Sequence, residues 1–397
     1  MPHFEFRALC ALLALCALPS SAAAYPFMVR HGYTGCAQCH VDPSGGGVLT
    51  PYGRAMGDVI LRTRYPFDTE DTLEPSSTAG FLWGTAPDLG PVLAQGDLRV
   101  SRLYRQVEGT DWQSDTIWMR ADLLAAVVWR CLRATASIGY AHEGALGAAI
   151  TRDVAPNLVS REHWAGCGFG EADEWLVRAG RMNVPFGLRN IEHTLWVRSL
   201  TETDINDDQQ HGVSVSYSGE LFRAELMAIL GNLQLRPDDF RERGYSGYIE
   251  WTSLQQVTFG ASSLVAHRDL DPQLRVPQWR QAHGVFSRWA TPWHPLVLMA
   301  EANYVVESPR YVPRRKGVVG VLQADLELIQ GVHGMLTGEL HDVGFEGAPF
   351  SYAGWLSAWW FFAPHADLRA DLTYQNIGSS ANDTGVWLAL LMAHVYL

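Results

Sequence analysis

From about residue 96 to the end of the chain, apolar and polar residues alternate with a period of two in many short segments. Successive side chains of a β-strand point to opposite faces, so each segment predicts a strand with one polar and one apolar face. The clearest case is 366–374, where Asp367, Arg369 and Asp371 alternate with apolar residues. Two other segments carry the polar sets Gln323, Asp325 and Glu327, and His333, Thr337, Glu339 and His341. Charges that repeatedly share one face predict a water-filled barrel interior.

Sixteen segments have this pattern, and most have the length of a tilted strand that crosses a bilayer. They cover residues 96–105, 115–129, 131–142, 156–169, 173–183, 210–218, 221–231, 245–254, 257–267, 279–290, 295–306, 316–327, 332–342, 350–362, 365–374 and 384–397. An even number is expected of a bacterial barrel, because both ends of its chain then lie on the same side of the membrane.

The connections between these segments alternate in length. Tight turns are expected at Arg130, 171–172, 218–220, 255–256, 291–294, 330–331 and 363–364, and the intervening loops are longer. Short periplasmic turns and long external loops are typical of outer-membrane barrels. The turns are flanked by Trp129, Trp175, Trp289, Trp293, Trp359 and Trp360, which fits either an interfacial aromatic girdle or core packing. The predicted fold is all-β, a 16-stranded antiparallel outer-membrane β-barrel.

The start of the chain has the pattern of a secretory signal peptide. Glu5 and Arg7 precede an apolar run at 8–18, and small residues then end in Ala22-Ala23-Ala24, an A-x-A cleavage site. We therefore expect residues 1–24 to be removed on export. Beyond them, no apolar run is long enough for a membrane-spanning helix.

The composition agrees with an exported barrel and excludes some functions. The chain has 37 Gly, 15 Trp and 14 Tyr, only 18% of its residues are charged, and its net charge is −12. A net negative charge argues against nucleic-acid binding. No pairing of a nucleophile with a base stands out, so hydrolytic catalysis is not indicated.

Cys36, Ala37, Gln38, Cys39 and His40 spell C-x-x-C-H shortly after the signal peptide. Two thiols at this spacing can both add to the vinyl groups of haem, and the adjacent imidazole can then ligate the iron. A zinc site would need further Cys or His at short spacing, and a disulfide would leave the histidine unexplained. The motif predicts one covalent haem c in a cytochrome c segment at 25–75, followed by a linker at 76–95 and the barrel at 96–397.

The second axial ligand of the iron is less constrained. Thr50 and Pro51 predict the start of a short helix that carries Met56, and the glycine-rich stretch 45–47 could fold this helix back over the haem. Met56 is therefore the favoured ligand, with His31 and Met28 as alternatives. The lumen-facing His333 and His341 are better explained as solvated polar residues.

Two cysteines remain outside the haem motif. Cys131 opens the third predicted strand and Cys167 lies near the end of the fourth, so antiparallel pairing brings both to the periplasmic rim. A disulfide between them and two separate small apolar side chains are both consistent with this position.

The exported motif, the following segment Leu49-Thr50-Pro51-Tyr52-Gly53-Arg54 and the barrel together resemble the fused monohaem cytochrome–porins of the bacterial outer membrane, which include iron oxidases. The specific likeness spans only about Gly35 to Arg54. This resemblance implies that the haem segment plugs the lumen and passes electrons from an extracellular donor, often Fe(II), to a periplasmic carrier. Under this hypothesis the protein is an electron carrier, or is similar to an Fe(II) oxidase, and lies in outer-membrane lipid with its haem segment in the lumen or periplasm.

A second segment, 178–188, is similar to the G-R-x-x-x-P-F-G stretch of phosphate-selective-type porins. In those proteins the loop folds toward the lumen, which would place Arg189 and His193 near the pore. The alternative function is therefore a solute-selective porin whose haem anchors a plug. Acids in the long loops could attract cations, but solvated loop charge explains them as well: Glu202, Asp204, Asp207, Asp208, Asp238, Asp239, Asp269 and Asp271.

Overall fold

The computed structural model describes residues 26–33, 35–65, 74–87, 89–141, 157–189, 192, 194–231, 242–254, 256–271, 274–293, 295–344, 350–378 and 383–397. The expected signal peptide at 1–24 lies outside these residues, as do His193, Asp238 and Asp239.

Seventeen strands lie within the described residues, and they follow the predicted segments closely. They are β1 (Val92–Val107), β2 (Gln113–Trp129), β3 (Leu132–Ala141), β4 (Asn157–Val159), β5 (His163–Phe169), β6 (Trp175–Met182), β7 (Gln210–Ser218), β8 (Phe222–Gly231), β9 (Arg243–Leu254), β10 (Val257–Arg268), β11 (Gln278–Ala290), β12 (Leu296–Pro309), β13 (Arg315–Ile329), β14 (Val332–His341), β15 (Ser351–Ala363), β16 (Ala366–Ile377) and β17 (Thr384–Tyr396). The first strand begins at Val92, inside the expected linker, because Val92 still pairs with Val127.

The strands form one closed antiparallel sheet, since β1 pairs with both β2 and β17. Both β4 and β5 pair with β3, so they are two pieces of the fourth predicted strand. Between them, Ser160, Arg161 and Glu162 face only Ser137 and Ile138, which makes a bulge with one extra residue. The prediction of a 16-stranded antiparallel barrel is confirmed, with one extra short strand that comes from this interruption.

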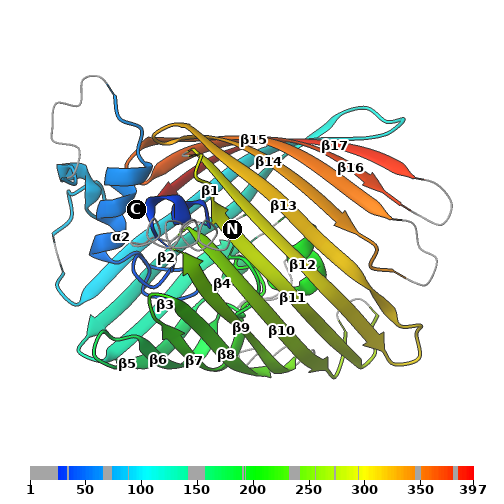
Figure 1. The fold of residues 1–397 in the computed structure, drawn as a ribbon, viewed down its shortest axis with the longest axis horizontal. Coiled ribbons are helices and arrows are strands. Elements are labelled where there is room, and N and C mark those ends of the chain that lie inside the picture. The colour runs from blue at the N-terminus through cyan, green and yellow to red at the C-terminus, as the bar shows by residue number, and fades with distance from the viewer. Residues whose placement is uncertain are drawn as a thin grey trace, which may run out of the picture.

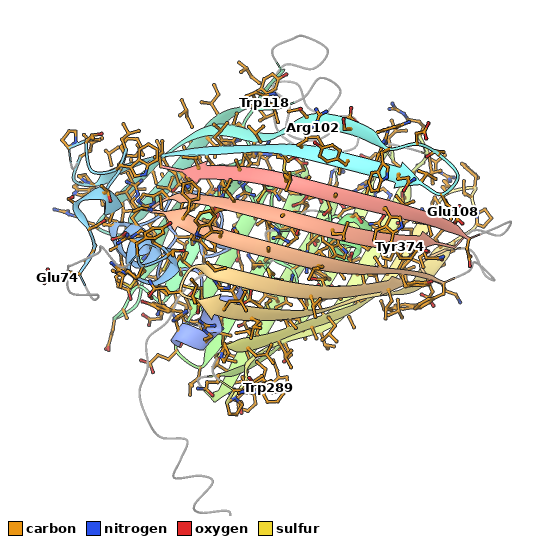
Figure 2. The ribbon with its side chains drawn as sticks, turned by 90° about the horizontal axis from the view of Figure 1, so that it is seen from above. Glu74, Arg102, Glu108, Trp118, Trp289 and Tyr374 are labelled. Atoms are coloured by element: carbon orange, nitrogen blue, oxygen red, sulfur yellow. The ribbon has the colours of Figure 1, made fainter. Side chains whose placement is uncertain are left out.

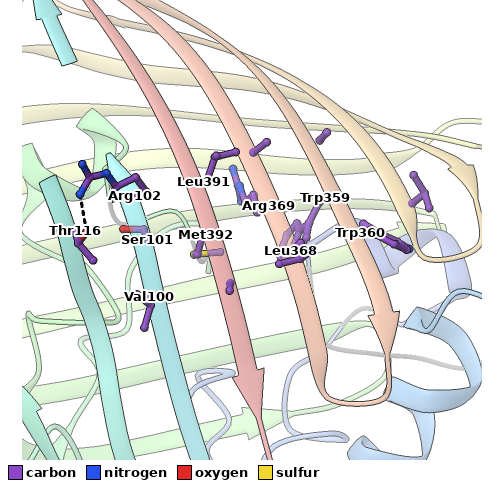
Figure 3. Close-up of a pocket in the computed structure, with 14 residues that line it drawn as sticks. Val100, Ser101, Arg102, Thr116, Trp359, Trp360, Leu368, Arg369, Leu391 and Met392 are labelled. Carbon is purple, nitrogen blue, oxygen red and sulfur yellow. Dashed lines mark hydrogen bonds between the residues drawn. The ribbon is translucent and has the colours of Figure 1, made fainter. Parts of the chain in front are cut away.

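Alternate side chains divide the wall into an apolar outer face and a polar inner face. Leu368 and Leu391 are exposed, whereas their chain neighbours Arg369 and Met392 are buried, and Figure 3 shows all four on the adjacent strands β16 and β17. The outer face carries few polar groups at this place. One is Arg102, which donates a hydrogen bond of 2.8 Å to Thr116 (Figure 3).

The tryptophans beside the short turns serve both expected roles. Trp129, Trp175, Trp289, Trp293 and Trp360 are exposed on the outside of the barrel, as an interfacial girdle requires. Trp359 is only 1% exposed and packs inside the lumen. The girdle interpretation is therefore wrong for Trp359, because this residue lies on the inner face of β15.

The helical elements are short. They are the α-helices α2 (Pro51–Met56) and α3 (Trp196–Thr201), the π-helical turn η2 (Gly57–Leu61), and the 3-10 turns η1 (Pro26–His31) and η3 (Ser77–Ala79). Among the described residues, no helix combines the length and the apolar character needed to span a membrane.

Two segments fill the lumen from opposite ends. Residues 26–65, here called the plug, lie at the end with the short turns, and residues 183–209, here called the inward segment, connect β6 to β7 and carry α3 (Figure 1). Figure 2 marks the two ends with Glu74, which follows the plug, and Glu108, in the β1–β2 connection. The inner face is polar, as predicted, but Asp325 and Asp367 are fully buried. A water-filled interior is thus wrong at these positions, because Asp325 is bonded to His333, and Asp367 to Trp359 and His394.

Candidate functional site

The haem motif forms one tight turn inside the plug. The backbone N–H groups of Cys39 and His40 both donate to the carbonyl oxygen of Cys36, at 3.1 and 3.0 Å. This turn keeps the two cysteines and the histidine close together, as double attachment of one porphyrin requires.

A glycine turn folds the following chain back onto the motif. Gly45 and Gly47 have φ values of +86° and +67°, which favour glycine. The N–H of Thr50 then donates to the carbonyl of Cys39 at 2.8 Å, and its hydroxyl accepts from Gly53 at 3.0 Å to cap α2. A side chain at Gly53 would overlap the backbone of Cys39. The expected helix start is confirmed, and α2 lies directly against the motif.

The surroundings of His40 favour the form of the imidazole that can ligate iron. His40 is half-buried in the plug, and desolvation lowers its pKa to about 4, so the imidazole is neutral at physiological pH. Its Nδ1 atom is buried and has no hydrogen-bond partner among the described residues. A neutral imidazole is the form that binds iron. The donor set of two thiols and one neutral imidazole fits haem c.

A large apolar cluster surrounds Cys39. It joins the plug residues Phe27, Met28, Tyr33, Leu49 and Leu61 to wall residues that include Phe286, Met299, Trp359 and Phe361. Aromatic rings make close contact within it, with Phe27 at 4.5 Å from His333 and Trp359 at 4.9 Å from Phe361 between ring centroids. Apolar surroundings of this kind suit a porphyrin ring.

The candidates for the second axial ligand differ in their surroundings. Met56 ends α2 and packs against the apolar cluster, and Met28 is a buried member of it. His31 instead lies 3.7 Å from the carboxylate of Glu327. The structure therefore keeps both methionines in or against the apolar cluster that contains Cys39, and gives His31 a polar partner on β13.

Of the two lumenal histidines, His333 is not the solvated side chain that we expected, whereas His341 is half-buried. His333 is only 2% exposed, and its Nδ1 lies 3.0 Å from Asp325. His341 packs edge-on against Trp196 of α3, with ring centroids 4.6 Å apart. The expectation is wrong for His333 because Phe27 of the plug covers it, while His341 keeps an exposed part beside Trp196.

Ion pairs fix the plug to the wall. Asp42 lies 2.5 Å from Arg178 of β6, which also lies 2.8 Å from Glu225 of β8. Burial alone would raise the pKa of Asp42, but Arg178 and Ser44 hold it below its ordinary value, so the carboxylate stays ionised. A second buried pair joins Arg30 to Glu327.

Backbone groups of the plug also bond to the short turns. The N–H of Thr63 donates to Phe361 at 2.9 Å, and the side chain of Gln330 donates to the carbonyls of Val59 and Arg62 at 2.9 Å each. Gly331 has φ +79°, and any side chain there would collide with Leu61. The plug is therefore bound at the rim that carries the short turns.

The inward segment is anchored to the opposite wall. Glu301 of β12 accepts from the backbone N–H of Leu188 at 2.8 Å and pairs with Arg198 of α3. Glu339 of β14 accepts from the N–H of Trp196 at 2.6 Å. The expectation that this loop folds toward the lumen is thus confirmed in the described residues, and Arg189 donates to the carbonyl of Ser44 in the plug at 3.1 Å.

Most of the described loop carboxylates that could attract cations form ion pairs with arginines. Glu202 and Asp271 both pair with Arg268, and Asp207 lies 2.8 Å from Arg161. The exposed Asp269 lies 3.1 Å from Arg243, and Asp208 accepts from the backbone N–H of Asp204 at 2.8 Å. Most of these carboxylates are therefore already compensated by cations of the protein.

Cys131 and Cys167 are neighbours, as the predicted register required. Cys167 pairs with Leu132, and the N–H of Gly168 donates to the carbonyl of Cys131 at 2.7 Å. The two cysteines are not joined by a disulfide, and the thiol of Cys167 donates to the carbonyl of Gly168 at 3.5 Å. Their oxidation state in the cell remains a prediction to test.

Comparisons with solved structures identify the fold of the barrel. The chain is similar to OmpT, an outer membrane protein of Vibrio cholerae, with a TM-score of 0.58 at 9% identity over 78% of this chain and 99% of that one. It is also similar to the anion-selective porin from Comamonas acidovorans (TM-score 0.56, 13% identity, 76% and 99% covered) and to the outer membrane channel DcaP of Acinetobacter baumannii (TM-score 0.56, 13% identity, 77% and 97% covered). No family model and no curated protein matches the sequence. The barrel has the fold of outer-membrane porins.

Some residues of the lumen were not found from sequence. The ion-pair partners Arg178, Glu225, Glu301 and Arg30 lie on four different elements, and no local motif links them. The only sequence signal for these ion pairs was the charged face of each strand. Charged side chains on an inner face need partners of opposite charge when the lumen is filled.

Proposed function

We propose that the protein is an outer-membrane cytochrome–porin that carries electrons between an extracellular donor, such as Fe(II), and a periplasmic carrier through one covalent haem c. The observation that carries this proposal is the position of the C-x-x-C-H turn, with Cys39 in an apolar cluster shared by the plug and the wall, inside the lumen of a porin-like barrel. The apolar outer wall supports an outer-membrane location, with the short turns and the plug toward the periplasm.

The position of the plug implies that the electron acceptor and the electron donor reach the haem from opposite ends of the barrel. A haem at the short-turn end lies close to a periplasmic carrier, whereas the hydrocarbon layer of about 30 Å separates the haem from the cell exterior. The donor would therefore approach from the long-loop end, past the inward segment. Haem supplies the one-electron redox chemistry, while Cys36 and Cys39 hold it, His40 ligates the iron and Met56 is the proposed second ligand.

The test is a visible spectrum of intact cells that express the protein. Under this proposal, external Fe(II) or a membrane-impermeant reductant reduces the haem without lysis. A haem that stays oxidised in intact cells, and is reduced only after lysis, would contradict electron transfer across the membrane.

The second candidate is a solute-selective porin whose haem anchors the plug. The observation that favours it is the inward segment, since the barrel fold is that of porins and Arg189 lies in the lumen. Under this hypothesis, the purified protein conducts ions freely in planar bilayers, and His40→Ala changes its stability but no redox activity. Under the electron-transfer proposal the conductance is small.

We also propose that Cys131 and Cys167 form a disulfide in the mature protein, because the periplasm is oxidising and the strand register places the two cysteines beside each other. Peptide mapping of unreduced protein should recover the two peptides as one linked species. Two separate thiol-labelled peptides would show that the bridge does not form.

A further inference from the structure

The outer wall formed by β15, β16, β17, β1 and β2 carries one charged side chain. Alternation along β1 puts Leu98, Val100, Arg102 and Tyr104 on its outer face. Among the outward positions of these five described strands, Arg102 is the only charged residue. A charge that faces lipid is costly in the middle of a bilayer and tolerated near its surfaces. Charged residues that persist in such a place mark functional sites.

Arg102 lies toward the end of the wall that carries the long loops. Leu391 of β17 pairs with Arg102, and Trp387 stands four residues farther toward that end. Trp387 is exposed on the outer wall, as an interfacial girdle requires. The guanidinium of Arg102 extends in the same direction, because it donates to Thr116 at 2.8 Å and to Ser114 at 2.6 Å on β2. The charge therefore lies close to the headgroups of the leaflet on the long-loop side.

A groove runs from Arg102 across the outer wall (Figure 3). It has a volume of about 540 Å³, and its lining includes Arg102 and Thr116 at one end and Trp360 at the other. Between these ends, Leu391 and Leu368 line it. Trp360 belongs to the girdle beside the short turns, at the opposite surface of the membrane. The groove thus begins near one headgroup level and passes through the hydrocarbon layer.

We propose that Arg102 and this groove bind one phosphorylated lipid of the outer leaflet. The lipid phosphate accepts hydrogen bonds from the guanidinium, which binds phosphate through paired, charge-assisted contacts. An acyl chain of the same lipid lies in the groove between Leu368 and Leu391. The inference goes beyond the proposed function, because it needs the outer-membrane location and orientation but not the haem.

Charge complementarity favours a lipid over a second copy of the chain. The outward positions of the five strands include no carboxylate, so the protein supplies no acid to Arg102 on this wall. A second copy docked through the same wall would bring another arginine and no acid. A lipid phosphate at headgroup level supplies the missing negative charge.

The test is native mass spectrometry of the purified protein in detergent, mixed with bisphosphorylated lipid A or with the same lipid after removal of its phosphates. Wild type should retain one phosphorylated molecule and at least about tenfold less of the dephosphorylated form, as expected for the loss of hydrogen bonds to a charged group. Arg102→Gln should lower retention of the phosphorylated lipid to the same extent. Arg105→Gln is the matched control, since Arg105 points to the other face of β1 and donates to Gln113.

Two further measurements separate the groove from the charge. Leu391→Trp fills the groove and leaves Arg102 in place, so it should also reduce retention of the phosphorylated lipid. Inorganic phosphate, added at the concentration of the lipid, should not displace it, because free phosphate gains nothing from the groove. Heat-dependent migration in electrophoresis shows that each variant barrel is folded.

Three results would overturn the inference. The first is equal retention of the two lipids by wild type, or unchanged retention in Arg102→Gln. The second is displacement by inorganic phosphate, which would show a phosphate site without a lipid. The third is a changed oligomeric state in Arg102→Gln or Leu391→Trp with retention unaltered, which would show that a second copy covers the groove. None of these results depends on the haem, so they leave the electron-transfer proposal to its own test.

Discussion

The plug and the inward segment both fill the lumen, but they are held there in different ways. The plug is fixed by buried pairs such as Asp42 with Arg178, by backbone hydrogen bonds to the short turns, and by an apolar cluster shared with the wall. The inward segment is held mostly by polar contacts to Glu301, Glu339, Arg268 and Arg369, with a smaller apolar contact around Leu195 and Val197. The plug thus shares a large apolar core with the wall, whereas the inward segment is held mainly through its charged and polar groups.

The largest expected effect is the loss of covalent haem when the two cysteines of the plug are replaced. In the variant Cys36→Ser/Cys39→Ser, covalent haem should be lost completely, because no thioether can form. Haem staining after denaturing electrophoresis measures this. Cys131→Ser/Cys167→Ser is the matched control and should stain like wild type. Covalent haem that persists in the first variant would disprove the assignment of the motif.

A second effect tests how firmly the plug is bound. Asp42→Ala removes the partner of Arg178 and should destabilise the seated plug by about 3 kcal/mol, the usual cost of breaking a buried ion pair. Limited proteolysis should then cleave the plug while the barrel stays intact. Asp269→Ala removes an exposed pair and should cost less than about 1 kcal/mol. Equal protease resistance in the two variants would show that the ion pair does not hold the plug.

Weakening the contacts of Glu301 should loosen the inward segment without affecting the plug. Glu301→Gln weakens the contacts to Arg198 and to the N–H of Leu188, which should cost about 2 kcal/mol, as for hydrogen bonds to a charged group. Planar-bilayer conductance should rise, because the segment then leaves the lumen more often. Haem content should stay at the wild-type level. A variant that loses haem without gaining conductance would show that the two segments are not anchored independently.

The smallest expected effect is a pH dependence within the inward segment. Burial, with repulsion from Asp204, raises the pKa of Asp208 to about 7. The folded loop therefore favours the protonated carboxyl, and its stability should be greatest below pH 4 and fall as the pH rises through 7. Amide hydrogen exchange of residues 203–208, corrected for intrinsic rates, should be faster at pH 8 than at pH 5. Asp208→Asn should remove the difference, and equal protection of the wild type at both values would contradict it.

The sequence by itself determined the strands, their alternating connections and the haem motif. These features are local, since a period of two follows from backbone geometry and C-x-x-C-H from the spacing of reacting groups. The helix start at Thr50 and the neighbouring positions of Cys131 and Cys167 followed from equally local rules.

Only the tertiary structure decided what fills the lumen. The burial of His333, the inward position of Trp359 and the pairing of Arg178 with both Asp42 and Glu225 all depend on residues far apart in the chain. A polar inner face is compatible with water or with a packed plug, because both satisfy its charges. Which of the two occurs depends on whether another segment can bring opposite charges to it, and no local pattern contains that information.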